Sequence, residues 1–186
     1  MNFDVVLFKV TEFSKIIPKP WRKIMDLDIR NVVADDFMGI ARLAENCGHM
    51  STMPNAVYHL FTRHFTETSF VVEDNSNQKI LGFLLGFISQ DDPEESYIHL
   101  LCLDSKLRGG GIGKTIMNRF AETVSKKGCK KIKLVTKPHN KISINFYLKM
   151  GFKSYKSPET FESEGLNVYK DYDGPDQDKI IFIKSL

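Results

Sequence analysis

The sequence predicts a mixed α/β (α+β) fold with a central sheet of about seven strands, parallel strands at its core and about four helices. Two segments of helical periodicity and a hairpin come first, followed by a strand–helix–strand–helix–strand order. Strands joined through helices run parallel to each other. Residues 97–103 are almost continuously apolar, which is typical of a central strand covered on both faces.

The first half of the chain supplies three strands and two helices. Alternation predicts a short strand over 27–30, and the turn 74–77 joins predicted strands 68–73 and 80–89. Asp35 or Asp36 is expected to cap a helix of apolar periodicity that ends before Gly48. A second helix is expected to open at Pro54 and Asn55.

The second half continues with regular alternation of helix and strand. The predicted elements are a helix over 112–125, a strand over 131–136, a helix over 142–150, a strand from Phe152 and a last strand over 180–183. The 186 residues suit one domain, residues 26–186, preceded by a basic extension or linker over 1–25.

Composition excludes several classes of protein. A net charge of +3 gives no support for nucleic-acid or membrane binding as the main activity. No segment approaches the ~18 consecutive apolar residues of a membrane span. The cysteines, Cys47, Cys102 and Cys129, are odd in number and show no paired spacing, which argues against a disulfide framework and for a reducing, cytoplasmic setting. Neither they nor the histidines show zinc-ligand spacing, so no metal is expected.

The chemistry of the chain concentrates in residues 101–115, where a buried strand runs through a glycine-rich turn into an amphipathic helix. Glycines allow backbone amides to adopt conformations and approaches that side chains would block. A helix start leaves amides unpaired at the positive end of the helix dipole. Together these features predict a cradle for phosphate. The turn reads Arg108-Gly109-Gly110-Gly111-Ile112-Gly113, followed by Lys114 and Thr115.

Three phosphate-binding patterns compete for this turn. The Walker loop of nucleotide triphosphatases fits at Gly113 and Lys114, but its first required glycine falls on Arg108. The dinucleotide pattern fits Gly109 and Gly111, but its last glycine falls on Lys114. The third pattern, Arg/Gln-x-x-Gly-x-Gly/Ala, is matched at every position by Arg108, Gly111 and Gly113.

That third pattern resembles motif A of the GNAT N-acetyltransferase superfamily, in which the turn binds the pyrophosphate of coenzyme A. A second segment, Asn140 to Phe152, is similar to the family's Asn-x-x-x-x-x-Φ-Tyr-x-x-x-Gly-Phe segment, where Φ is apolar. The order of elements extends the resemblance from Leu27 to about Phe152. The resemblance implies the GNAT fold and acetyl-CoA as the cofactor.

The resemblance also implies cofactor contacts. Backbone amides of strand 97–103, at Leu101 and Leu103, are expected to meet the thioester carbonyl, and Asn140 the pantetheine arm. Arg108 is expected to assist the amides at the phosphate. The implied cofactor-binding residues are Leu101, Cys102, Leu103, Arg108, Gly109, Gly110, Gly111, Ile112, Gly113, Lys114, Thr115, Asn140, Ser143 and Phe146.

Acyl transfer from a thioester requires a neutral amine and a proton for the departing thiolate. By resemblance, Tyr147 is the candidate general acid. His99 is the candidate base, because histidine titrates near neutrality and because His99 and Tyr97 stand where arylalkylamine N-acetyltransferases carry two histidines. Glu95, with Glu94, is the competing base at the start of the strand.

The acceptor carries no comparable signature. The resemblance assigns it to the region of the first two helices, where Met50 and Met53 stand, and to the last hairpin. The acidic and aromatic residues of that hairpin, among them the segment 171–175, would suit a cationic amine. Residues 64–68 resemble a segment of diaminobutyrate acetyltransferases, although the spacing to the upstream match differs.

The leading hypothesis is therefore an enzyme that moves an acetyl group from acetyl-CoA to a primary amine by direct attack. The acceptor could be a small amine, an amino acid, an antibiotic or a protein N-terminus. A homodimer is one expectation, because family members are often dimers. The alternatives are a non-catalytic acyl-CoA-binding sensor and, as a narrower enzyme, a diaminobutyrate-type acetyltransferase.

Overall fold

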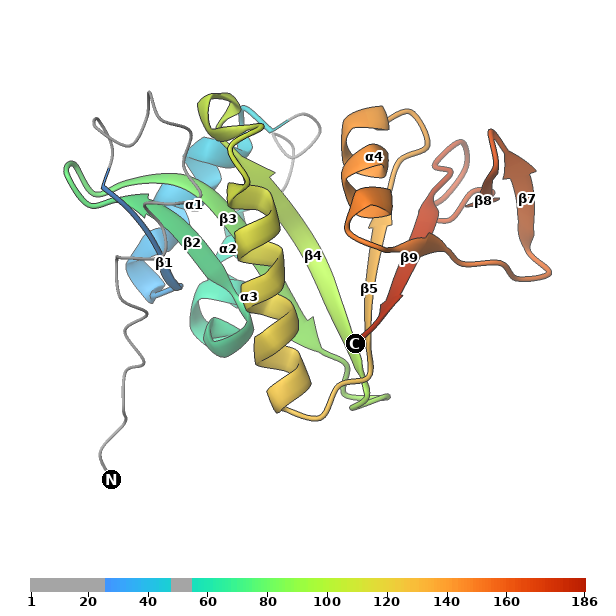
Figure 1. Ribbon diagram of the computed structural model, residues 1–186, viewed down its shortest axis with the longest axis horizontal. Helices are drawn as coiled ribbons and strands as arrows, with labels where there is room; N and C mark the ends of the chain where they lie inside the picture. The colour runs from blue at the N-terminus through green and yellow to red at the C-terminus, as the bar shows by residue number, and fades with distance from the viewer. Residues whose placement is uncertain (1–25, 48–54) are drawn as a thin grey trace.

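The computed structural model describes residues 26–47 and 55–186 (Figure 1). A seven-stranded sheet has the order β1-β2-β3-β4-β5-β9-β6, and β7 and β8 form a separate two-stranded sheet. The strands are β1 (Leu27–Asn31), β2 (Phe70–Asp74), β3 (Lys79–Ile88), β4 (Glu95–Leu103), β5 (Lys131–Thr136), β6 (Lys153–Ser154), β7 (Thr160–Ser163), β8 (Leu166–Tyr169) and β9 (Ile180–Ser185). The α-helices are α1 (Phe37–Ala44), α2 (Asn55–His64), α3 (Ile112–Lys126) and α4 (Lys141–Lys149).

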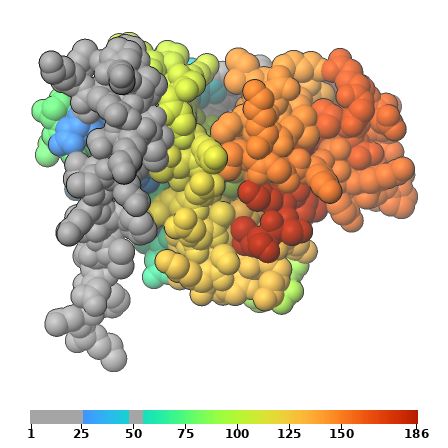
Figure 2. Space-filling model, viewed as in Figure 1, coloured from blue at the N-terminus to red at the C-terminus, as the bar shows by residue number. Residues whose placement is uncertain are grey.

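The helices cover the sheet from both sides (Figure 1). Helices α1 and α2 bury one core cluster against β2, β3 and the end of β4. Helices α3 and α4 bury a second, larger cluster on the opposite face, and Figure 2 shows them next to each other on that face. Strands β4 and β5 are the parallel pair, and the other pairings of the sheet are antiparallel. The predicted mixed sheet with a parallel core is confirmed.

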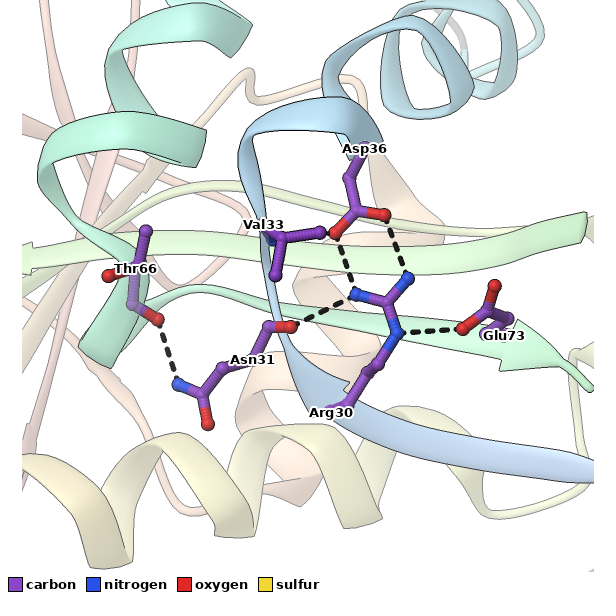
Figure 3. Close-up of polar contacts among 6 residues, drawn as sticks. All are labelled: Arg30, Asn31, Val33, Asp36, Thr66 and Glu73. Carbon is purple, nitrogen blue, oxygen red and sulfur yellow. Dashed lines mark hydrogen bonds and ion pairs between the residues drawn. The ribbon is translucent and has the colours of Figure 1, made fainter. Parts of the chain in front are cut away.

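One edge of the sheet is fixed to α1 by an arginine with two carboxylate partners (Figure 3). The Arg30 guanidinium donates two hydrogen bonds to Asp36, at 2.7 and 2.8 Å, and one to Glu73 at 2.7 Å. The bond to Asp36 is the main cause that raises the pKa of Arg30. Asp36 precedes α1, as predicted for a cap, but its carboxylate accepts from Arg30 and from the Val33 amide instead of a helix amide.

Strand β4 contains a bulge that decides which side chains reach the site. The register with β3 pairs Leu100 with Leu85 and Ile98 with Gly86, so His99 is the extra residue. An extra residue reverses the alternation of faces that follows it. Accordingly Ile98 lies in the cluster under α3, whereas Leu100 lies in the cluster under α1 and α2.

Beyond the bulge, β4 and β5 diverge. Their parallel register runs from Glu95↔Lys131 to Ile98↔Leu134 and ends there, although both strands continue. In Figure 1 the two strands separate toward the end of the sheet where α3 begins, with α3 on one side and α4 on the other. The sheet therefore opens directly in front of the glycine-rich turn.

Two expectations from the sequence are corrected. A disulfide joins Cys47, just after α1, to Cys102 in β4, with Cα atoms 6.2 Å apart, so the expectation of no disulfide is wrong. The spacing of the cysteines did not indicate this pair, because Cys47 and Cys102 are 55 residues apart in the sequence. The hairpin of β7 and β8 was not assigned strands, because each strand is only four residues long and three of the four residues of β7 are exposed. Met50 and Met53 lie outside the described residues.

Candidate active site

The glycine-rich turn leads into a run of backbone amides at the start of α3 that have no helix partner. Gly109 and Gly111 have φ values of 78° and 83°, the left-handed region that favours glycine. Helix α3 begins at Ile112, and its first i→i−4 bond is donated by the Thr115 amide to the Gly111 carbonyl at 3.1 Å. The amides of the three residues between them, 112–114, therefore precede the helix ladder and are left for another acceptor. This donor set fits a pyrophosphate, because an anion there also meets the positive end of the helix dipole.

Glycine also lets three elements meet beside the turn. A Cβ on Gly113 would lie 3.3 Å from the Leu103 Cδ1 atom of β4 and 3.3 Å from the Phe146 Cε2 atom of α4. A Cβ on Gly109 would meet nothing within 4 Å, so the turn is open on that side. The turn therefore has a packed side toward β4 and α4 and a free side toward a ligand. Arg108 and Lys114 are exposed beside it.

The backbone of β4 presents an unpaired edge next to this turn. The Asp104 amide, just after β4, donates a hydrogen bond to the Leu81 carbonyl of β3 at 2.8 Å. Backbone groups of an antiparallel strand point alternately to its two sides. Those of Leu101 and Leu103 therefore point toward β5, in the region where the β4–β5 register has ended. The side chain of Cys102, between them, lies on the face of the sheet that α1 and α2 cover, where it forms the disulfide.

Tyr147 lies on α4 at the other side of the opening. Burial is the main cause that raises its pKa to about 12, and a hydrogen bond with the Ser143 side chain acts in the opposite direction. Rings of Phe146, Phe152 and Phe182 surround it at centroid distances of 5.6 to 5.9 Å. Its phenol is therefore fixed in place and protonated at neutral pH. Asn140 caps α4 by accepting from the Ser143 amide at 3.2 Å.

His99 and Tyr97 lie together on β4, their ring centroids 6.2 Å apart. The His99 ring stacks on Phe61 of α2 at 5.3 Å, and burial lowers its pKa, so it is neutral at pH 7. Burial raises the pKa of Tyr97 to about 12, with smaller contributions from Tyr172, Asp173 and Tyr147. Sequence reasoning noted the position of Tyr97 but gave it no role, because its electrostatic interaction with Tyr172 and Asp173 arises only in the fold.

Glu95 occupies the opposite end of β4. Its carboxylate lies 3.4 Å from the ammonium of Lys131 and 3.5 Å from that of Lys133. It is thus engaged in ion pairs at the end where β4 and β5 are still paired. The glycine turn thus packs against β4 and α4 through Gly113, and Tyr97 lies beside His99 and interacts electrostatically with Tyr147, whereas Glu95 is engaged at the other end of β4. Among the described residues, no group of three or more His, Cys, Asp or Glu side chains could hold a metal ion.

Comparison with known proteins agrees with this architecture. Residues 34–152 match the model of the acetyltransferase (GNAT) family. The chain is 26% identical over 119 residues to N-alpha-acetyltransferase 30 of Schizosaccharomyces pombe, covering 61% of this chain and 76% of that protein. It is 27% identical over 101 residues to an L-2,4-diaminobutyric acid acetyltransferase of Streptomyces coelicolor, covering 54% of this chain and 59% of that protein.

A solved structure shows the same fold. It is a diaminobutyrate acetyltransferase from Paenibacillus lautus, in complex with its substrate L-2,4-diaminobutyric acid and coenzyme A. The TM-score is 0.68 at 20% identity, and the match covers 86% of this chain and 94% of that one.

The fold is that of the GNAT acyltransferases. The family match extends over more than half of the sequence, so the chain belongs to the GNAT family, and it is an N-acetyltransferase. No described helix is long and apolar enough to cross a membrane.

Proposed function

We propose that this chain transfers an acetyl group from acetyl-CoA to a primary amine at the opening between β4 and β5. The observation that carries the proposal is the set of free amides at the start of α3, which lies beside the unpaired edge of β4. An anion binds at such a helix start, and a carbonyl oxygen accepts from an unpaired strand amide.

The residues of the turn would hold the cofactor by its pyrophosphate. The amides of Gly109, Gly111 and of residues 112–114 supply donors, and exposed Arg108 adds a charge-assisted contact. The Thr115 hydroxyl already donates to the Gly111 carbonyl at 3.2 Å, so it acts on the turn rather than on a ligand. Asn140 and Ser143, at the start of α4, border the same opening and would contact the pantetheine arm.

Two side chains would act as the general base and the general acid of the reaction. His99 is half-buried and neutral, so it can accept the proton that the acceptor ammonium must lose before the neutral amine attacks the thioester carbonyl. Tyr147 is protonated and buried, so it can donate to the departing thiolate. The amides of Leu101 and Leu103 would stabilise the negative charge that develops on the carbonyl oxygen. We favour His99 over Glu95 as the base, because Glu95 is engaged with two lysines.

Release of free thiol from acetyl-CoA over a panel of primary amines tests this function. We expect thiol release that depends on the amine and yields one acetylated amine per thiol. Tight binding of coenzyme A without turnover for any amine would instead support the alternative, a non-catalytic acyl-CoA-binding sensor. Cytoplasmic location and a homodimer remain predictions from the sequence.

A further inference from the structure

Two buried hydroxyl groups hold β3 opposite the bulge of β4. The register of β2 with β3 ends at Phe70↔Leu84, two residues before Gly86. The Thr68 hydroxyl donates to the Gly86 carbonyl at 2.7 Å, and the Ser69 hydroxyl lies 3.3 Å from both the carbonyl and the amide of Gly86. The side chains of Thr68 and Ser69 are both buried. At Gly86 they therefore supply the hydrogen bonds that a paired strand would otherwise supply.

Gly86 is the residue of β3 against which the bulge forms. It pairs with Ile98, which directly precedes the extra residue His99, and a Cβ on Gly86 would lie 2.8 Å from the Tyr97 carbonyl oxygen. A bulge leaves its extra residue unpaired and disrupts the ladder locally. Ile98 is also the last residue of β4 that pairs with β5. The two hydroxyls thus fix β3 at the point where the sheet opens.

The segment that carries these hydroxyls also holds the His99 ring. Phe61 of α2 stacks on this ring at a centroid distance of 5.3 Å, with 11° between the ring planes. The Phe65 amide donates to the Phe61 carbonyl at 3.3 Å, and the Thr68 amide donates to the Phe65 carbonyl at 3.2 Å. One bonded segment therefore holds the ring through Phe61 and, through Thr68 and Gly86, the bulge from which the ring projects.

This segment is in turn anchored to the edge of the sheet. Asn31 of β1 donates its side-chain amide to the Thr66 carbonyl at 2.8 Å (Figure 3). The Val32 amide donates to the Ser69 carbonyl at 3.1 Å. Because the turn is bonded to β1 and to the residue after it, the hydroxyls of Thr68 and Ser69 are presented to Gly86 in fixed positions.

We propose that Thr68 and Ser69 are positioning residues for acetyl transfer, which act by fixing the bulge that presents His99. The inference rests on the proposed function, in which His99 accepts a proton. A base must lie within hydrogen-bond reach of the proton that it removes, so a small shift of its backbone lowers the rate. Neither hydroxyl has to contact a substrate, because both are engaged with Gly86. Other residues form the turn that would bind the pyrophosphate, so binding of acetyl-CoA should not depend on them.

The first test follows the His99 ring in the protein without substrates. Labelling with ¹³C-histidine gives one Cε1–H signal for each of the five histidines, and the signal lost in His99→Gln is that of His99. A proton near the face of an aromatic ring resonates upfield, so stacking on Phe61 gives this signal a characteristic position. We expect the signal to move toward that of a solvent-exposed histidine in Thr68→Val and to stay in place in Thr68→Ser, which keeps the hydroxyl.

A second histidine provides an internal control for this measurement. The His59 ring stacks on Phe37 at a centroid distance of 3.8 Å, and its signal should be the same in the wild type and in Thr68→Val. A His99 signal that does not move in Thr68→Val overturns the inference, as does an equal movement of both histidine signals, which would indicate a general loosening of the fold.

The second test separates kcat from KM. Thiol release from acetyl-CoA is measured with L-2,4-diaminobutyrate and with a pentapeptide that has a free N-terminus. We expect Thr68→Val to lower kcat roughly tenfold, since a misplacement of about 1 Å can cost a factor of about 100. KM for acetyl-CoA should stay within about twofold, and Thr68→Ser should keep most of the wild-type kcat. Thr123→Val is the matched control, because it removes a hydroxyl that donates to the Arg119 carbonyl within α3 at 2.8 Å, and it should leave kcat unchanged.

The double variant Thr68→Val/His99→Gln decides whether the hydroxyl acts through His99. If it does, Thr68→Val lowers kcat by less than about twofold once His99 is absent, because the two changes remove the same function. Equal losses of kcat with and without His99, or a large rise in KM for acetyl-CoA, would overturn the inference. If Thr68→Val does not fold, Ser69→Ala carries both tests with the same expected signs. No thiol release by the wild type with any amine overturns the proposed function instead, and the His99 signal then still decides whether the hydroxyls hold the ring.

Discussion

Two glycines in the left-handed region of the backbone, one before α3 and one after it, offer a test of the phosphate cradle. Gly109, in the turn before α3, has a φ of 78°, and Gly128, after the end of α3, has a φ of 97°. A Cβ at either position would meet nothing within 4 Å. Alanine at each position therefore changes the backbone preference alone in the free protein. A ligand is expected to occupy the space beside Gly109 but not the space beside Gly128.

The magnitudes follow from this geometry. A left-handed conformation costs an L-residue about 1–2 kcal/mol, and the lost chain entropy of the unfolded state offsets about 0.4–1 kcal/mol of that. Both Gly109→Ala and Gly128→Ala should therefore lower Tm by about 2–4 °C in a chain of this size. A charge-assisted hydrogen bond is worth about 1.5–3 kcal/mol, so losing one to phosphate should raise KM for acetyl-CoA roughly 10- to 100-fold in Gly109→Ala alone.

Thermal unfolding and steady-state thiol release provide the two measurements. Equal Tm losses with a KM effect confined to Gly109→Ala would support the cradle. The reasoning is refuted if Gly109→Ala leaves KM for acetyl-CoA unchanged, or if Gly128→Ala raises it equally.

Four further outcomes are expected. Tyr147→Phe should lower kcat at least roughly tenfold across pH 6–10, because a pKa of about 12 keeps the phenol protonated over that range; an unchanged kcat would exclude the acid role. His99→Gln should remove the acid limb of kcat/KM, which the wild type should show below pH 6.5 because burial lowers the pKa of the ring; persistence of the limb would point to another base. Gly82→Ala would place a Cβ 2.4 Å from the Leu103 side chain and should cost about 1–3 kcal/mol in urea unfolding, a value near zero meaning that the side chain rotates away. Asp36→Ala should cost about 1–3 kcal/mol in the same assay by removing both hydrogen bonds to the guanidinium of β1, and a neutral result would show that water replaces them.

The part of the candidate site that depends on neighbouring residues could be predicted from the sequence. The turn from Arg108 to Gly113 could be interpreted from sequence because glycine spacing and a helix start act within a few residues. The predicted strand 131–136 agrees with β5 at both ends, because its alternation is regular and one of its faces is fully buried. Sequence information was sufficient wherever the determining contacts were close along the chain.

The remaining features depend on contacts between distant segments. The bulge at His99 arises from its register against β3, and no pattern within β4 announces it. The disulfide of Cys47 with Cys102 depends on how α1 packs on the sheet. The pairing of Asp173 with Lys179 requires the bridge that closes the β8–β9 loop. The bulge, the disulfide and the ion pair are all tertiary contacts, so local sequence patterns could not predict them.

The central claim is that the amides at the start of α3 hold the pyrophosphate of coenzyme A. Amide chemical shifts in a ¹⁵N-labelled 21.3 kDa protein test it directly on addition of coenzyme A. We predict that the largest shifts belong to Gly109, Gly111 and residues 112–114, while the amides of Gly128 and Gly165 stay in place. Shifts confined to other parts of the chain, with these five amides unmoved at saturation, would contradict the claim.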